Sequence, residues 1–114
     1  MMKANVLGTE YEIVVTGNKK DYPYLEEADG YCDTSIKRIV VCDCEDSKND
    51  PSALRDLEEY KRKVIRHEVV HAFLYESGLS VNSNSEWATN EEMVDYFAIQ
   101  FPKIAKVFKE LKII

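Results

Sequence analysis

Two stretches in the first half of the chain have the hydrophobic and polar pattern of β-strands. The first runs from Glu10 to Thr16 and ends at Gly17-Asn18, and the second runs from Ile36 to Cys42 and ends in a polar segment. Val, Ile, Tyr and Thr favour extended backbone, whereas Gly and Asn favour turns. Segment 21–30 holds a proline, a glycine and four acidic side chains, so irregular structure with one short helical turn is expected. The pattern predicts a small sheet of two or three strands.

The second half of the chain has a helical pattern. Asp50 is a suitable helix N-cap, Pro51 is a suitable first residue, and no breaker follows until Gly78, which suits the position just past a helix end. These signals predict one long helix over residues 51–77. Its C-terminal half is apolar nearly all round, so we expect that half to be deeply buried.

A polar connection, residues 80–88, separates this helix from a second one. Thr89 and Glu92 have the spacing of a capping box, which predicts a helix start at Thr89. Pro102 is expected to break or kink the helix. A short terminal helix is predicted beyond it from apolar residues at helical spacing, namely Ile104, Val107, Phe108 and Leu111. Residues 1–114 should therefore form a single α+β domain.

Charge and cysteine content narrow the classes of partner and compartment. The chain of 114 residues has 21 acidic and 15 basic residues and a net charge of −6, which opposes binding to nucleic-acid backbones or anionic membranes. No apolar leader or membrane-length segment is present. Cys32, Cys42 and Cys44 are an odd number of thiols, as expected in the cytoplasm. These three thiols could form a second metal site or a redox switch, although a structural zinc site needs four ligands. The sequence does not indicate the oligomeric state.

The chain has two histidines, and both lie in the pentad HEVVH, residues 67–71. Residues four apart on a helix project from one face, so His67 and His71 can bind one zinc ion. Glu68 is rotated by about 100° from His67. It is therefore better placed to act as general base on a zinc-activated water than as a ligand. The alternative is a hydrogen-bonded pair of core histidines without a metal.

A catalytic zinc site needs a third protein ligand, and with no histidine left this must be a carboxylate. The candidates are Glu86, Glu91, Glu92 and Asp95. Glu92 is engaged if the capping box forms, and Glu86 lies in the expected loop. Glu91 and Asp95 share a helix face. If Glu91 binds zinc, Asp95 can accept a hydrogen bond from a ligand histidine.

The pentad, followed by Asn90-Glu91-Glu92-Met93-Val94-Asp95, resembles the HExxH and NExxxD motifs of gluzincin metallopeptidases, with a separation of 91 − 71 = 20 residues. In length the chain resembles the small intracellular ImmA/IrrE-like peptidases of phages and mobile elements, although Val70 stands where those usually have glycine. The resemblance implies a zincin-like domain with a short sheet packed on the HExxH helix, then a ligand-bearing helix and a C-terminal helix. It also implies one zinc ion per chain, held by His67, His71 and Glu91, with Glu68 as base and Asp95 bonded to His67.

The resemblance further implies a protein or peptide substrate, such as a transcriptional repressor. Strand 36–42 would be the edge strand on which an extended substrate binds. Tyr75 and Tyr96 are the candidates for stabilising the oxyanion. The alternative function is that of a non-catalytic, zinc-stabilised interaction protein. It is disfavoured because structural zinc usually has four protein ligands and does not require Glu68.

Overall fold

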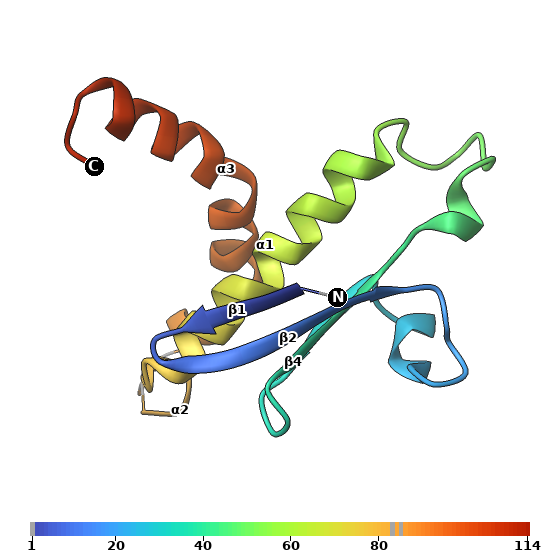
Figure 1. Ribbon diagram of the computed structural model, residues 1–114, viewed down its shortest axis with the longest axis horizontal. Helices are drawn as coiled ribbons and strands as arrows, with labels where there is room; N and C mark the ends of the chain where they lie inside the picture. The colour runs from blue at the N-terminus through green and yellow to red at the C-terminus, as the bar shows by residue number, and fades with distance from the viewer. Residues whose placement is uncertain (1, 83, 85) are drawn as a thin grey trace.

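The protein folds as a four-stranded mixed sheet with one long helix packed on one face, in a computed structural model that describes residues 2–82, 84 and 86–114 (Figure 1). The strands are β1 (Met2–Val6), β2 (Thr9–Thr16), β3 (Gly30–Asp33) and β4 (Arg38–Cys42), in the spatial order β1-β2-β4-β3. β1 and β2 are antiparallel, β2 and β4 are parallel, and β3 is antiparallel to β4. The α+β fold class is confirmed.

The sheet has two strands more than the two clearest sequence patterns predict. β1 joins β2 through a tight hairpin in which Leu7 and Gly8 both have positive φ, 51° and 94°, as a two-residue turn of the primed type requires. β3 is only four residues long. It pairs with β4 from Gly30 opposite Val41 to Asp33 opposite Arg38. β4 therefore lies inside the sheet, and the expectation that residues 36–42 form an edge strand is wrong.

Segment 21–30 contains the expected helical turn, the 3-10 helix η1 (Pro23–Glu26). A second 3-10 turn, η2 (Glu45–Ser47), follows β4. The loop that carries η1 is tied to the long helix, because the Tyr60 hydroxyl donates a hydrogen bond to Asp29, just before β3. This contact fixes the position of the β3 edge relative to the helix.

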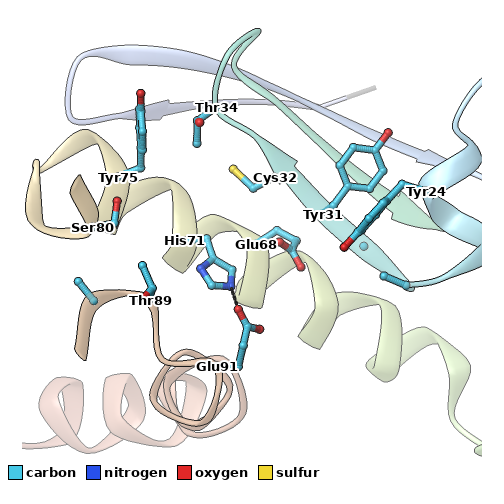
Figure 2. A pocket seen from close by; sticks show the side chains of 13 residues that line it. Tyr24, Tyr31, Cys32, Thr34, Glu68, His71, Tyr75, Ser80, Thr89 and Glu91 are labelled. Carbon is cyan, nitrogen blue, oxygen red and sulfur yellow. Dashed lines mark ion pairs between the residues drawn. The ribbon is translucent and has the colours of Figure 1, made fainter. Parts of the chain in front are cut away.

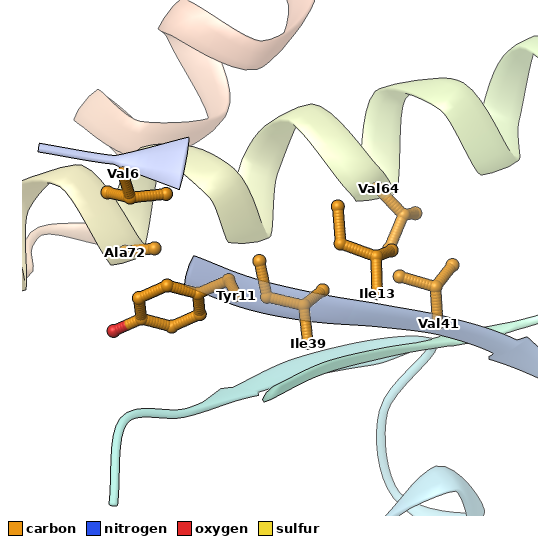
Figure 3. Close-up of a cluster of buried hydrophobic side chains, with 7 residues drawn as sticks. All are labelled: Val6, Tyr11, Ile13, Ile39, Val41, Val64 and Ala72. Carbon is orange, nitrogen blue, oxygen red and sulfur yellow. The ribbon is translucent and has the colours of Figure 1, made fainter. Parts of the chain in front are cut away.

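The hydrophobic core lies between the sheet and the long helix α1 (Leu57–Glu76) (Figure 3). Inward-facing residues of β1, β2 and β4 meet the α1 face formed by Val64 and Ala72. The core side chains are Val6, Tyr11, Ile13, Ile39, Val41, Val64 and Ala72. Burying β-branched side chains on a pleated surface stabilises both the sheet and the helix position.

Helix α1 begins later than predicted. Its N-cap is Asp56, whose carboxylate accepts a hydrogen bond from the Glu59 N–H at 3.0 Å. Asp50 instead accepts bonds from the N–H and the hydroxyl of Ser52, at 2.9 and 2.7 Å, which closes a local turn and makes the predicted start at Pro51 wrong. The predicted end is confirmed, since Gly78 follows it with φ of 85°.

Fewer residues of α1 are buried than its composition predicts. The buried residues are Val64, Glu68 and Ala72, each one turn from the next, whereas Phe73 is exposed. The expectation of a deeply buried C-terminal half is therefore wrong. α1 packs against the sheet on one side and against α3 (Glu91–Glu110) on another, which leaves a strip of its surface uncovered by the described residues.

The expected polar connection after α1 contains α2 (Leu79–Asn82) and the 3-10 turn η3 (Trp87–Thr89), while Ser83 and Ser85 lie outside the described residues. Helix α3 is capped by Asn90, whose side chain accepts from the Met93 N–H at 2.9 Å. Thr89 belongs to η3, and its hydroxyl donates to the Glu86 carbonyl. The predicted capping box at Thr89 is therefore wrong.

Pro102 lies inside α3 without ending it, so the predicted terminal helix is the C-terminal part of one helix. A proline has no N–H, which leaves the carbonyl four residues earlier without its helical donor. That carbonyl belongs to Ala98, and it accepts a hydrogen bond from Arg66 Nε of α1 at 2.5 Å. The neighbouring helix thus satisfies the group that the proline leaves unpaired. Within the described residues, no helix combines the length and apolarity needed to span a bilayer.

Candidate metal centre

His67 and His71 lie one helical turn apart on the α1 face that meets α3. Their ring centroids are 4.9 Å apart, and their side chains are 15% and 22% exposed. Burial lowers the pKa of His71, which favours the neutral imidazole. A neutral imidazole offers a lone pair to a metal ion. This part of α1 is therefore well suited to present two nitrogen ligands.

Glu91, in the first turn of α3, faces both histidines. Its two carboxylate oxygens lie 2.9 Å from His67 Nε2 and 2.9 Å from His71 Nε2. Its side chain is 71% exposed, so it can move outward without disturbing the core. Among the described residues, these three form the group whose ligand atoms lie close enough, within 4.8 Å of one another, to share one cation.

Two nitrogens and a carboxylate are the donor set of a zinc site with an open position. Ligand atoms around a tetrahedral zinc lie about 3.4 Å apart, given bond lengths near 2.0–2.1 Å. The 2.9 Å contacts of Glu91 need only a small opening to reach that spacing. The residues therefore fit zinc, and the predicted ligands are brought together.

Asp95, one turn after Glu91, lies on the far side of the His67 ring. Its Oδ1 is 3.0 Å from His67 Nδ1 and 3.1 Å from Lys63 Nζ. Partial burial raises the pKa of Asp95, but hydrogen bonds from His67 and Lys63 outweigh that and hold the pKa below its ordinary value. An ionised Asp95 fixes the proton of His67 on Nδ1 and leaves Nε2 free to bind a cation. The predicted neighbour of the first histidine is thus in contact with it.

Glu68 points to a different side of α1 from the histidines, toward the sheet. It is 7% exposed, and burial raises its pKa to about 7. A carboxyl group with a pKa near neutrality can both accept and return a proton at physiological pH. Figure 2 shows Glu68 and His71 entering the same pocket from α1, with Glu91 reaching His71 from below.

The pocket has a volume of about 420 Å³ and is bounded by α1, β3, η1, α2, η3 and the first turn of α3. Gly30 of β3 allows the edge strand to approach α1, since a Cβ at this position would lie 2.6 Å from Val64 Cγ1. The Tyr24 and Tyr31 rings meet edge to face, with centroids 5.3 Å apart, and form the wall beside Glu68. Figure 2 shows the Tyr24 hydroxyl turned toward Glu68 and the Tyr31 hydroxyl turned away.

The two tyrosines predicted as oxyanion stabilisers do not meet the metal-binding group. Tyr75 lines the pocket, but its hydroxyl points away from His71 in Figure 2, and its ring lies 4.9 Å from Lys37 Nζ. Tyr96 is exposed and packs on Phe97 outside the pocket. Tyr24 was missed because nothing in the sequence relates η1 to residues 67–71, which lie more than forty residues later.

The three cysteines have free thiols and are not part of the group formed by His67, His71 and Glu91. Cys32 lines the pocket from β3, and burial raises its pKa to about 12. Burial likewise raises the pKa of Cys44 to about 12, while the Cys44 N–H lies 3.1 Å from Cys42 Sγ. Thiols with such pKa values stay protonated and are poor ligands and nucleophiles.

Comparison with known proteins adds no relative to this description. The chain matches no protein-family model, no curated protein sequence and no solved structure. The interpretation of the site therefore rests on its own residues: two imidazoles, an exposed carboxylate and a buried carboxyl group around one pocket.

Proposed function

We propose that the protein is a zinc-dependent peptidase of the gluzincin type. His67, His71 and Glu91 would hold one zinc ion per chain, and Glu68 would serve as general base. The observation that carries the proposal is the combination of a three-residue ligand group with a buried carboxyl group, of pKa about 7, in the same pocket. A purely structural zinc site would favour a fourth protein ligand, and the described residues supply three.

Each residue has a distinct task in this mechanism. When bound, zinc lowers the pKa of a water molecule and polarises the scissile carbonyl. Glu68 accepts the proton of the attacking water and delivers it to the leaving amine. Asp95 keeps His67 in the tautomer whose Nε2 faces Glu91. The tyrosine wall and β3 restrict access of bulk water to one side of Glu68.

The substrate would bind as an extended peptide along β3. β3 is an outer strand of the sheet, and its residues Gly30 to Cys32 line the pocket beside Glu68. An edge strand offers unpaired backbone groups that can pair with an added strand. β4, which the sequence pattern favoured for this role, is paired on both sides. A cytoplasmic repressor-type protein is the substrate implied by the resemblance to ImmA/IrrE-like peptidases.

Metal content and peptidase activity of three variants test the proposal. We expect one zinc per chain in the wild type, near-normal zinc without turnover in Glu68→Gln, and weakened zinc binding in Glu91→Ala. Glu92→Ala is the matched control, because Glu92 is an exposed carboxylate in the same turn. Activity would be measured on a mixed peptide library, with cleavage products identified by mass spectrometry.

The outcomes separate the mechanism from its alternative. Loss of the base should lower the rate by about 10²–10⁴-fold. Full activity in Glu68→Gln would exclude Glu68 as base, and full zinc retention in Glu91→Ala would reassign the third ligand. Stoichiometric zinc with no cleavage of any peptide or candidate repressor by the wild type would favour a zinc-stabilised interaction protein.

A further inference from the structure

The outer edge of β3 has a defined set of outward-pointing backbone groups. The Cys42 N–H donates a hydrogen bond to the Asp29 carbonyl at 2.8 Å, so these two residues form a hydrogen-bonded pair of the antiparallel ladder. Such pairs alternate along a ladder, so the N–H and C=O groups of Tyr31 also point toward β4. The N–H and C=O groups of Gly30 and Cys32 therefore point outward. A strand added at this edge would pair with these two residues.

The side chains of β3 alternate between the two faces of the sheet. A Cβ at Gly30 would meet Val64 of α1, so Gly30 and Cys32 lie on the face that α1 covers. Tyr31 and Asp33 lie on the opposite face, called here the outer face. Side chains of an added strand are distributed over the same two faces. Every second side chain would therefore lie beside Tyr31 or Asp33, on the outer face.

Charged side chains of alternating sign form a row across the outer face. The register places Lys3 opposite Glu12, and Glu12 opposite Arg38. It also places Arg38 opposite Asp33. Arg38 Nε lies 2.9 Å from Glu12 Oε1, which leaves Asp33 without an ion pair among the described residues. Hydrogen bonds from Ser35 hold the pKa of Asp33 below its ordinary value, so the row ends at the β3 edge with a negative charge.

The neighbouring row on the outer face is apolar. Val14 lies opposite Val40, and Val40 lies opposite Tyr31. The Tyr31 ring meets the Tyr24 ring edge to face, with centroids 5.3 Å apart, and Tyr24 is 53% exposed. This row therefore ends at the β3 edge with an aromatic surface on which a further apolar side chain can pack.

We propose that the substrate is an extended peptide with a lysine or arginine two residues away from an apolar or aromatic residue. The proposal rests on the binding of substrate along β3 put forward above. The basic residue lies opposite Asp33 and continues the row of alternating charges, and the apolar residue lies opposite Tyr31. Opposite charges at facing cross-strand positions stabilise a sheet, whereas like charges destabilise it. The residue between them lies beside Cys32, which lines the pocket that also holds Glu68.

Peptide binding to the full chain tests this selection without depending on cleavage. The probes are amidated hexapeptides of serine and threonine with an N-terminal fluorophore, carrying arginine and leucine two positions apart in either order. Reference probes replace the arginine with neutral citrulline or with glutamate. Fluorescence anisotropy would be measured with zinc-loaded Glu68→Gln, in which the peptides are expected to stay intact. The preferred order reports the strand direction, since arginine comes first in a strand antiparallel to β3 and second in a parallel one.

The arginine probe should bind about two- to fivefold more tightly than the citrulline probe, as expected for one opposite-charge cross-strand pair. The glutamate probe should bind most weakly, and the differences should shrink with added salt. Asp33→Asn should remove the preference for arginine over citrulline, and Asp33→Lys should reverse the order of the charged probes. Glu10→Lys is the matched control, because Glu10 is an exposed carboxylate on the outer face of β2, and it should keep the arginine preference. Circular dichroism checks that each variant is folded.

The outcomes separate this inference from the peptidase proposal. Selective binding of the arginine probe without cleavage of any peptide by the wild type would refute the peptidase and leave the selection of basic peptides standing. Cleavage by the wild type, with equal affinity for the three kinds of probe, would refute the selection alone. An arginine preference that persists in Asp33→Lys would also refute it. Self-association of the chain alone that Asp33→Lys abolishes would overturn it in favour of a second copy, because β1 is also an outer strand and Lys3 ends the same row.

Discussion

Replacing Glu68 with Gln should stabilise the protein in the presence of a chelator at alkaline pH, although it removes the proposed base. Burial raises the pKa of this carboxyl group from 4.5 to about 7. The folded protein therefore holds the Glu68 proton more tightly than the unfolded chain does. The free energy of unfolding therefore falls as the pH rises from 4.5 to about 7, because in this range the unfolded chain binds fewer protons than the folded protein does. This loss of folding stability is complete above pH 7 and absent in acid.

The size of the effect follows from the two pKa values. Each pKa unit corresponds to about 1.36 kcal/mol, so a rise from 4.5 to about 7 corresponds to about 3 kcal/mol. Gln has nearly the same shape and no charge. The free energy of unfolding of Glu68→Gln should therefore exceed that of the wild type by about this amount above pH 7. For a chain of this length the midpoint of thermal unfolding should differ by roughly 10 °C. Urea unfolding across the pH range, with chelator present, measures the difference.

A second carboxylate on α1 provides a control with the opposite sign. Glu76 accepts hydrogen bonds from the Tyr11 hydroxyl at 2.7 Å and from Lys37 at 2.9 Å, and these bonds lower its pKa. Glu76→Gln should therefore destabilise the protein at neutral pH, and the difference should vanish in acid. A Glu68→Gln effect that does not change with pH, or a less stable variant at alkaline pH, would refute the reasoning.

Three further predictions test other contacts. Asp95→Asn should weaken zinc binding by about 10–100-fold in competition with a chromophoric chelator, because it loosens the hold on the first ligand histidine; unchanged affinity would remove Asp95 from the site. Asp56→Ala should cost about 1 kcal/mol in urea unfolding, whereas Asp50→Ala should not shorten the helix measured by circular dichroism. Arg66→Leu should cost about 1–3 kcal/mol by leaving the Ala98 carbonyl unpaired, and Pro102→Ala should recover part of this; simple additivity would contradict the contact.

The sequence is sufficient to predict the strands with the strongest local preference. β2 and β4 are rich in Val and Ile, and both were expected. β1 and β3 were missed because their residues, MKANV and GYCD, carry little intrinsic β-preference. These strands form because a neighbouring strand and α1 bury one of their faces. The order of strands, with β4 inside and β3 at the edge, is likewise set by tertiary contacts.

Helix starts were predicted near the right place but at the wrong residue. Asp50 and Asp56 are both good caps, and so are Thr89 and Asn90. The choice depends on which side chain meets a free backbone N–H. Asp50 is engaged by Ser52, and Thr89 by Glu86. Local competition of this kind is decided by geometry that propensity alone does not contain.

The ligand group was more predictable than the pocket around it. His67 and His71 are fixed by helical spacing, and Glu91 follows from the gluzincin resemblance. The burial of Glu68 beneath the β3 edge and the tyrosine wall at Tyr24 depend on contacts between distant segments. Such contacts leave no short-range signal in a single sequence.

The division between ligands and pocket wall also bears on the order of folding. His67 and Glu91 are 24 residues apart, whereas the contact that ties β2 to the end of α1, from Thr9 to Glu76, spans 67 residues. Closing the longer loop costs about 1 kcal/mol more in chain entropy, so the two helices should associate before the sheet docks. A cation present during refolding would then be captured by the helix pair while Glu68 is still hydrated. Burial of that carboxyl group beside Gly30, which is 38 residues earlier in the chain, would then follow the pairing of the two helices.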